Sequence, residues 1–594
     1  MSVIHILRQS MLHNMTQNRV HRLFRLAAIG LIMALSLSFL AHRQLPVTSL
    51  ETAHNTLTKK VLPRIHVDND LVSDAVASRY TTDQIPDPLP NIEDFPLYGA
   101  SPQTDQVYLE IYSSSEKANI DRQNERWLVE VAEAFNKQQQ KNSSGKVIQV
   151  GIRKIASGTA ARLIGAGATQ PAGYSPSNNL WISMIKSQGI EVTPVAERLV
   201  ANTAGWVVPG EVYQQLQANG EVTFDSLLNA VAAQQVSVAY PNPYKSSTAL
   251  NLLYTLYWRA ANHQTDSKAL TTAELETPQV KSVVDQFQSQ VLITTPTTLE
   301  LQELFLRDQS QLQAFPLEYQ NYLTLKQVAG FESTEFIPFG IPHNNPLVGF
   351  DWNTPETAEA LKTFAEFAQS PDMVKLANNQ GFVETDYLQS NSHPPIPDGE
   401  TLLATQSTWK VNKDGNRTVY LEMVIDTSGS MDGEPLKALQ KGLRIASQQI
   451  NQGNQVGLVT FAERPVRRLE LAPFDKLQQQ KLLAAVDQLH AHGGTAMYDG
   501  VMVALANLME KRINDPDGRF YLLLLSDGDV NRGYEFRKVK DIMAHSNVRF
   551  YPIAYGEVNK AELQAIANLK ESTVKQGNPE NVQTLFKDLF QVNL

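Results

Sequence analysis

From about Thr418 onward the sequence alternates short apolar runs with amphipathic stretches, and this alternation constrains the fold more than any other feature. The apolar runs occupy residues 419–426, 455–461, 519–527 and 548–556. Helical patterns fill or follow the intervals, at 435–450, 475–489, 497–512 and 560–569. Buried strands separated by helices form βαβ units, so residues 418–594 are predicted to be an α/β domain with a doubly wound parallel sheet.

Carboxylate and hydroxyl side chains follow the ends of two of these predicted strands. Asp426 ends the first strand and Asp527 follows a later one, while Thr495 opens a helix after two glycines. Ligand sites of such sheets lie beyond the carboxyl ends of the strands, so we expect these groups to share one crevice. Hard oxygen donors suit a small octahedral cation, Mg²⁺ or Mn²⁺. The candidate metal ligands are Asp426, Ser428, Ser430, Thr495 and Asp527.

The pattern Asp-x-Ser-x-Ser, with a distant threonine and a later aspartate, resembles the metal-ion-dependent adhesion site of von Willebrand factor type A domains. The resemblance covers about 418–594. It implies that the two serines and the threonine coordinate the metal directly or nearly so, while the aspartates often act through water. It also implies that an Asp or Glu of a partner protein completes the shell, since hydroxyl ligands leave the cation under-neutralised.

Two weaker interpretations concern the same loops. The three hydroxyl residues are also suited to helix capping, and the two aspartates are suited to turns. The presence of all five residues in the order of the motif favours the metal site. Asp499, four residues after Thr495, either orients the loop or, as we expect, is an ordinary acid at the positive end of a helix.

Residues 105–390 show a second mixed α/β pattern, with apolar runs at 107–114, 146–155 and 236–243. Helical patterns follow at 124–140, 249–261 and 354–370. This order, with the stretches YSPSNNLWISMIK (174–186) and PNPYKSSTALNLLYTLYW (241–258), resembles two-lobed periplasmic solute-binding proteins. The resemblance implies that this region binds a small solute or peptide.

Two hydroxyl-rich turns open helices in this region. One holds Ser157 and Thr159, and the other holds Ser246, Ser247 and Thr248. Helix N-termini carry free N–H groups and a positive dipole end, so these turns are candidate ligand-binding residues for an anionic or polar group. If they face each other across the lobes they form a clamp; the alternative is ordinary N-capping.

The beginning of the chain predicts export. Residues 1–25 are basic and precede an uncharged apolar run at 26–41, the pattern of a signal segment. Because Phe39 makes a poor cleavage position, an uncleaved signal-anchor is our first expectation, with the body in the periplasm or outside the cell. Cleavage and secretion is the second. Residues 42–104 are interpreted as a tether and 391–417 as a linker.

Composition excludes several classes of function. A net charge of −10 without a chain-wide basic surface argues against nucleic acid as a partner. The absence of cysteine excludes disulfides, thiolate metal sites and a cysteine nucleophile.

Together these features predict a membrane-anchored extracytoplasmic binding or scaffold protein. We do not expect an enzyme, because one cation site without an obvious general base or second metal is poor hydrolytic machinery. The alternatives are a metal-dependent hydrolase and a cytoplasmic chelatase or ATPase accessory subunit, another setting of von Willebrand factor type A domains.

Overall fold

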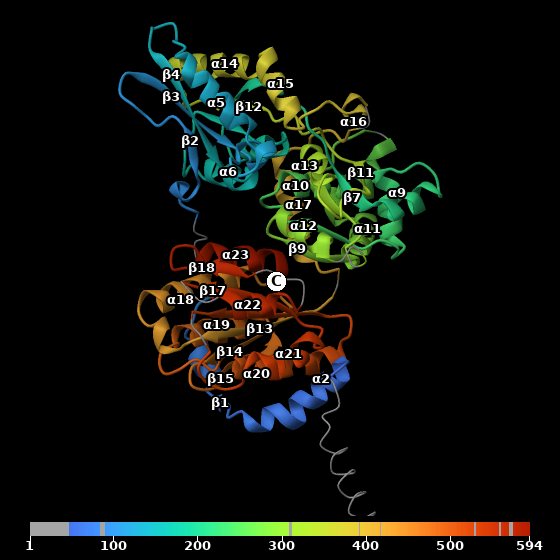
Figure 1. Ribbon diagram of the computed structural model, residues 1–594, viewed down its shortest axis with the longest axis vertical. Helices are drawn as coiled ribbons and strands as arrows, with labels where there is room; N and C mark the ends of the chain where they lie inside the picture. Colours follow the sequence, from blue (N-terminus) through green and yellow to red (C-terminus); the bar gives the residue numbers. More distant parts are fainter. Residues whose placement is uncertain are drawn as a thin grey trace, which may run out of the picture.

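A computed structural model describes residues 47–594, apart from gaps at 83–88, 266, 308–309, 311, 391–392, 416, 528–529, 557–559 and 570–573. The predicted export segment, residues 1–41, lies outside the described residues. Within the described ranges no helix combines the length and apolar character needed to cross a membrane. Figure 1 shows a two-lobed body above a C-terminal α/β domain.

The C-terminal domain is built on a seven-stranded sheet in the order β1-β15-β14-β13-β16-β17-β18. Its strands are β1 (Asp68–Asn69), β13 (Val419–Asp426), β14 (Gln455–Phe461), β15 (Pro465–Pro473), β16 (Arg519–Ser526), β17 (Arg549–Tyr555) and β18 (Lys575–Gly577). The central strands are parallel, which confirms the predicted doubly wound fold. The prediction missed β15, which runs antiparallel to β14, because charged residues 467, 468 and 470 interrupt its apolar pattern.

Helices cover both faces of this sheet. On one face lie α18 (Glu434–Ala446), α19 (Lys476–Asp487) and α23 (Val582–Asn593); on the other lie α20 (Met497–Asn514), α21 (Phe536–Ala544) and α22 (Lys560–Ala567). Side chains of a strand alternate between faces, so Met423 and Ile425 of β13 enter the first core and Val424 enters the second. Burial on both faces explains why these strands are continuous apolar runs.

The middle region consists of two lobes, as predicted. The first lobe contains β2 (Leu97–Gly99), β3 (Gln106–Ser113), β4 (Val147–Lys154), β5 (Gly173–Ser175), β6 (Val192–Ala196) and β12 (Leu347–Phe350), in the order β2-β4-β3-β5-β12-β6. The second contains β7 (Ala204–Pro209), β10 (Phe315–Glu318) and β11 (Thr334–Pro338), with β8 (Val238–Pro241) paired to β9 (Val291–Thr295). The chain crosses between lobes at 197–203 and again at 339–346.

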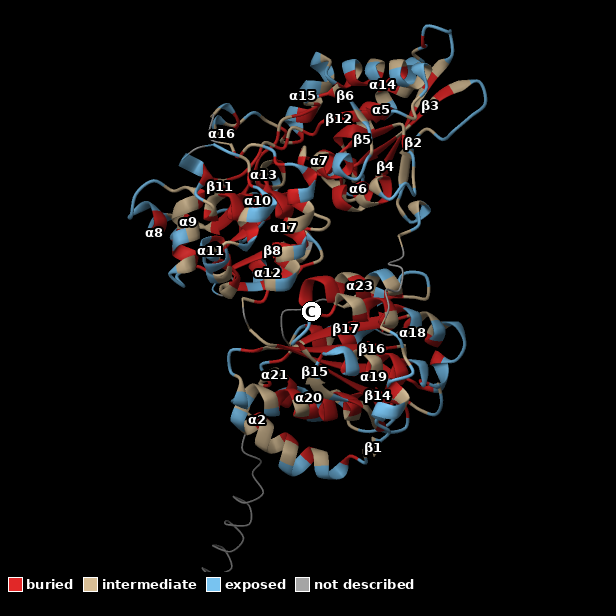
Figure 2. Cartoon of the chain, turned by 180° about the vertical axis from the view of Figure 1, so that it is seen from behind, coloured by how far each residue is buried: buried red, intermediate tan, exposed pale blue. Residues whose placement is uncertain are grey.

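The helices of the lobes pack their apolar faces onto these sheets, and Figure 2 shows buried residues concentrated along the sheets and the inner helix faces. The first lobe holds α4 (Ser115–Ala118), α5 (Trp127–Gln138), α6 (Ser157–Gly165), α7 (Leu180–Ser187), α14 (Pro355–Ala368) and α15 (Pro371–Asn379). The second lobe and its flank hold α8 (Gly210–Gln217), α9 (Phe224–Ala232), α10 (Ser247–Ala260), α11 (Pro278–Ser289), α12 (Thr298–Arg307), α13 (Tyr319–Leu325) and α16 (Asp386–Gln389).

The interpretation of residues 42–104 as a tether was wrong for much of its described part. Helix α2 (Leu50–Thr56) and the turns after it bury Ala53, Leu57, Val61 and Ile65 in the core beside α20. Ala53, Leu57 and Val61 recur every fourth position and so share one helical face, and Ile65 follows directly after the last turn. Strand β1 then pairs with β15, and α3 (Asp74–Ala77) lies against α19. This N-terminal arm is therefore part of the C-terminal domain.

The interpretation of residues 391–417 as a linker was also wrong for most of its length. Helix α17 (Gly399–Asn412) buries Leu402 and Trp409 in the core of the middle region, and Trp409 Nε1 donates to Tyr240 Oη at 2.7 Å. Its buried face also contains Thr405 and Gln406. Because polar side chains share this face, the helix has no clear apolar period in the sequence.

Candidate functional site

Asp426 anchors the loop at the end of β13. Its carboxylate is fully buried, with Oδ1 accepting from the backbone N of Ser428 at 2.8 Å and Oδ2 accepting from Ser526 Oγ at 2.7 Å. Burial raises the pKa of Asp426 to about 6 despite these hydrogen bonds. The carboxylate thus fixes the direction in which the serine loop leaves the strand.

The two predicted serines and Asp527 form a continuous chain of oxygens. Ser428 Oγ lies 3.1 Å from Ser430 Oγ, and Ser430 Oγ donates to Asp527 Oδ1 at 2.8 Å. Burial raises the pKa of Asp527 above its usual range. Residues of two neighbouring parallel strands are therefore brought into contact although 97 positions separate Ser430 from Asp527.

Thr495 belongs to a loop that lies directly against the serine loop. Gly429 N donates to Gly493 O at 3.1 Å, and His492 N donates to Thr427 O at 2.8 Å. Thr495 is buried, whereas His492 is exposed. Asp499 lies in the first turn of α20, as we expected, and its carboxylate also accepts from Tyr534 N of a neighbouring loop at 2.8 Å.

The oxygens fit a small divalent cation. Mg²⁺ holds oxygen ligands at about 2.1 Å, so adjacent ligands of an octahedron lie about 3.0 Å apart. The 3.1 Å and 2.8 Å separations along Ser428, Ser430 and Asp527 match that edge length. No group of three or more His, Asp or Glu side chains suited to a metal occurs within the described residues. The candidate site is instead rich in hydroxyls.

The candidate metal edge lies at the end of the strands opposite to their contacts with the second lobe. At the opposite ends of the strands, Arg519 Nη2 donates to Val291 O at 2.6 Å and Arg549 Nη1 donates to Leu292 O at 3.4 Å. Strand β16 has eight residues, which span about 26 Å. Ser430 is exposed at the far end of the strand.

The two hydroxyl-rich turns do meet across the lobes. Gly158 N, at the start of α6, donates to Lys245 O at 3.2 Å, and Trp181 Nε1 donates to Ser247 Oγ at 2.9 Å. Ser246 Oγ caps α10 by accepting from Ala249 N at 3.3 Å. The Gly158 N–H at the start of α6 and the hydroxyl of Ser247 are therefore already hydrogen-bonded to other protein groups.

The remaining members of the turns differ in burial. Ser157 Oγ is buried and lacks a hydrogen-bond partner among the described residues, Thr159 is half-buried and Thr248 is buried. N-capping therefore accounts for Ser246 but not for Ser157.

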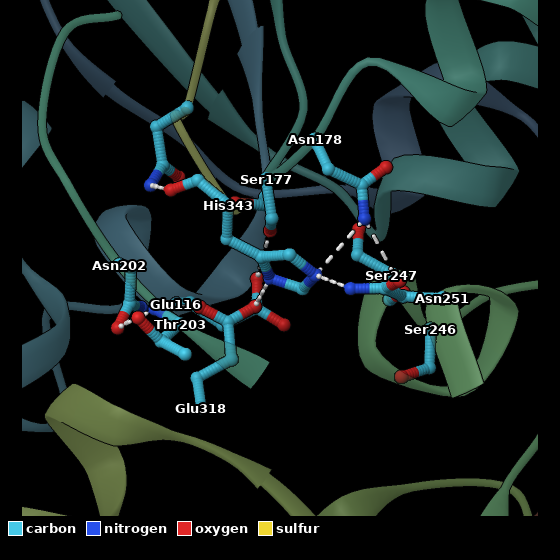
Figure 3. Close-up of polar contacts among 12 residues, drawn as sticks. Glu116, Ser177, Asn178, Asn202, Thr203, Ser246, Ser247, Asn251, Glu318 and His343 are labelled. Atoms are coloured by element: carbon cyan, nitrogen blue, oxygen red, sulfur yellow. Dashed lines mark hydrogen bonds and ion pairs between the residues drawn. The ribbon is translucent and has the colours of Figure 1, made fainter. Parts of the chain in front are cut away.

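A buried polar cluster at the lobe crossings was not foreseen (Figure 3). His343, from the second crossing, lies 2.9 Å from Glu318 Oε1 through Nδ1 and 3.0 and 3.1 Å from the amide nitrogens of Asn178 and Asn251 through Nε2. Because amide groups donate, Nε2 is the acceptor and Nδ1 carries the proton that Glu318 accepts. Asn202, from the first crossing, donates to Glu318 Oε2.

Two charged residues border this cluster. Lys117 is fully buried and its Nζ donates to Ser175 O at 2.7 Å. Burial lowers the pKa of Lys117 to about 7, and burial together with Glu318 raises the pKa of Glu116 to about 7. The residues of the cluster at the lobe crossings come from separate segments of the chain, so no spacing in the sequence signals it.

Comparison with known families agrees with both parts of this architecture. Residues 421–588 match the von Willebrand factor type A domain, and residues 123–383 match the bacterial extracellular solute-binding protein family. The chain joins these two domains. They are called the solute-binding domain and the type A domain below.

Individual relatives match only in part. An uncharacterised protein of Synechocystis is 24% identical over 182 residues, covering 30% of this chain and 42% of the relative. The inter-alpha-trypsin inhibitor heavy chain H4 of Sus scrofa is 33% identical over 116 residues, covering 18% and 12%. The chain spans less than half the length of the curated relatives it matches.

Solved structures resemble each domain separately. A von Willebrand factor type A protein from Catenulispora acidiphila is 23% identical with a TM-score of 0.27, covering 30% of this chain and 42% of the other. The sulfate-binding protein SubI from Mycobacterium tuberculosis is 15% identical with a TM-score of 0.33, covering 49% and 93%.

Proposed function

We propose that this protein is a membrane-anchored binding or scaffold protein that works outside the cytoplasm. Its type A domain engages an Asp or Glu of a protein partner through a bound Mg²⁺ or Mn²⁺. The observation that carries the proposal is the contact chain Ser428–Ser430–Asp527 at an exposed sheet edge, with Asp426 fixing the serine loop. The extracellular family of the other domain supports the location.

Each residue has a separate task in this proposal. Ser428, Ser430 and Thr495 hold the cation, and Asp527 orients Ser430 by accepting its hydroxyl proton. When bound, the cation supplies a coordination position for the partner's carboxylate. The proposed activity is binding and not catalysis.

The solute-binding domain is proposed to take a small solute or peptide between its lobes. Ser157 supports this role, because its buried hydroxyl has no hydrogen-bond partner among the described residues and lies at the start of α6. Entry of a ligand requires the contacts Gly158–Lys245 and Trp181–Ser247 to separate first.

The metal proposal is tested by Mn²⁺ binding and water proton relaxation on the purified protein. We expect one Mn²⁺ per chain with a high relaxation enhancement, which a short Asp-containing peptide lowers by displacing metal-bound water. Asp426→Ala and the double variant Ser428→Ala/Ser430→Ala should lose both effects and keep their secondary structure. Absence of Mn²⁺ binding, or binding unchanged in both variants, would contradict the proposal.

A further inference from the structure

Both backbone polar groups of Thr495 are held by one loop, residues 530–534, which follows Asp527 in the chain. Thr495 N donates to the side-chain Oδ1 of Asn531 at 2.9 Å. In return, the backbone N of Asn531 and that of Arg532 donate to Thr495 O at 3.3 and 3.4 Å. Thr495 is buried, so losing the acceptor of its N–H group carries a cost in free energy.

The same loop is fastened to the helix that follows Thr495. Asp499 Oδ1, in the first turn of α20, accepts from Tyr534 N at 2.8 Å. Gly533 has a φ of +74°, and a Cβ there would lie 2.5 Å from Asp499 Oδ1. A Cβ on Gly494 would similarly lie 2.7 Å from Asn531 Oδ1. The close approach of loop and helix therefore depends on these two glycines.

This arrangement ties two candidate ligands together. Asp527 precedes the 530–534 loop in the chain. Thr495 is hydrogen-bonded to this loop through both its backbone N–H and its backbone C=O. A shift of the loop would move Thr495 relative to Asp527, whereas a fixed loop holds them in one geometry. The side chain of Asn531 provides the part of this link that a substitution can remove.

We propose that Asn531 is a positioning residue for the cation, one that sets the place of Thr495 without binding the metal itself. This inference rests on the proposed function of the type A domain. Groups that orient metal ligands affect metal affinity by about 10-fold to 100-fold when they are removed, and we expect an effect of that size here.

The test compares Mn²⁺ affinity of the full chain with that of three variants by calorimetric titration. Asn531→Ala removes the acceptor and should weaken binding by about 10-fold or more. Asn531→Asp keeps an oxygen acceptor and should restore most of the affinity. Asn514→Ala, an exposed asparagine at the far end of α20, should bind as the wild type does.

Thermal unfolding in EDTA separates positioning from general stability. A positioning role predicts that Asn531→Ala loses metal affinity while its metal-free unfolding temperature stays close to that of the wild type. Wild-type affinity in Asn531→Ala would overturn the inference and leave the proposed function intact. Failure of the wild type to bind Mn²⁺ would overturn both.

A second measurement needs no variant. Hydrogen exchange of the wild-type chain, with and without Mg²⁺, reports on both segments. We expect the cation to slow exchange at residues 493–496 and 530–534 together. Protection of 493–496 alone would overturn the link.

Discussion

Lys245 Nζ lies 2.5 Å from Asp588 Oδ2, and this ion pair joins the loop before α10 of the solute-binding domain to α23 of the type A domain. The backbone O of Lys245 also accepts from Gly158 N of the opposite lobe. Nearby, Asn242 Nδ2 donates to Gln591 Oε1 at 2.9 Å. One short segment, 242–247, therefore contacts both lobes and the type A domain.

Charge reversal at this pair should loosen the docking of the two domains. Asp588→Lys places two lysines together and should speed hydrogen exchange at 241–247 and at 582–593. The swap Lys245→Asp/Asp588→Lys should restore most of the protection, with a coupling of about 1 kcal/mol because both side chains are partly exposed. Equal exchange in the single and double variants would show that the pair does not hold the domains.

Gly158→Ala should force the lobes apart. Its new Cβ would lie 2.1 Å from the backbone O of Tyr244 and 2.6 Å from Trp181 Cη2, and a backbone oxygen cannot move alone. The six tryptophans all lie between residues 127 and 409, so their fluorescence reports on the solute-binding domain. We expect a red shift as Trp181 meets water, and a larger radius of gyration. Thr159→Ala, which adds no atom, is the control and should show neither change.

A saturating divalent cation should stabilise the type A domain. Mg²⁺ at 100 times its dissociation constant should add about 2.7 kcal/mol to the free energy of unfolding. Asp527→Ala should lose this gain, because Ser430 Oγ then lacks its acceptor. All six tryptophans lie in the solute-binding domain or in α17 beside it, so tryptophan fluorescence follows the unfolding of that part of the chain. Circular dichroism follows the whole chain, so the transition that appears in circular dichroism and not in fluorescence is assigned to the type A domain. A Mg²⁺ effect of equal size in Asp527→Ala would argue against the site.

His343→Ala should destabilise the solute-binding domain selectively. It leaves the buried Glu318 without the hydrogen bond from His343 Nδ1, and a buried acceptor that loses its donor costs about 1–3 kcal/mol. Urea unfolding followed by tryptophan fluorescence should shift to lower denaturant, while Mn²⁺ binding is unchanged. The half-buried His545 of the type A domain offers a control, since His545→Ala should leave the midpoint of the solute-binding domain in place. A small shift would mean that the lobe crossings do not rely on this pair.

Glu422 should make stability depend on pH. It is fully buried in β13, accepts from Asn507 Nδ2 at 2.8 Å, and has a pKa raised by burial to about 8. The folded state therefore holds a proton that the unfolded state releases near its ordinary pKa, so this contribution is present at acidic pH and is lost as pH rises toward 8.

Glu422→Gln removes this titration. The unfolding free energy of the variant relative to the wild type should rise between pH 5 and pH 9, by a few kcal/mol in all, in denaturation measured at both pH values in EDTA. A difference that is the same at pH 5 and pH 9 would show that Glu422 does not titrate in this range.

Much of the type A domain could be predicted from its sequence. Four strands coincide with continuous apolar runs that are buried on both faces, namely β13, β14, β16 and β17. Such a run ends where polar residues begin, so the sequence also indicates where each strand ends. The carboxyl ends of parallel strands meet at one edge, so the proximity of Ser430 to Asp527 follows from the fold class once the strands are known.

Other features were decided only by the tertiary structure. The cluster of Asn178, Asn202, Glu318 and His343 joins segments separated by up to 165 positions, and buried polar partners have no sequence period. Asn531 likewise bonds a backbone N–H that any residue except proline would present.

The sequence by itself determined the two domain types and the oxygen set at the sheet edge, because repeated burial and strand ends leave a regular pattern in the chain. The tertiary structure alone decided that the N-terminal arm and α17 belong to folded domains and that the lobes close on each other. Those outcomes depend on which surfaces meet, and a surface with mixed polar and apolar residues such as that of α17 encodes its partner only in three dimensions.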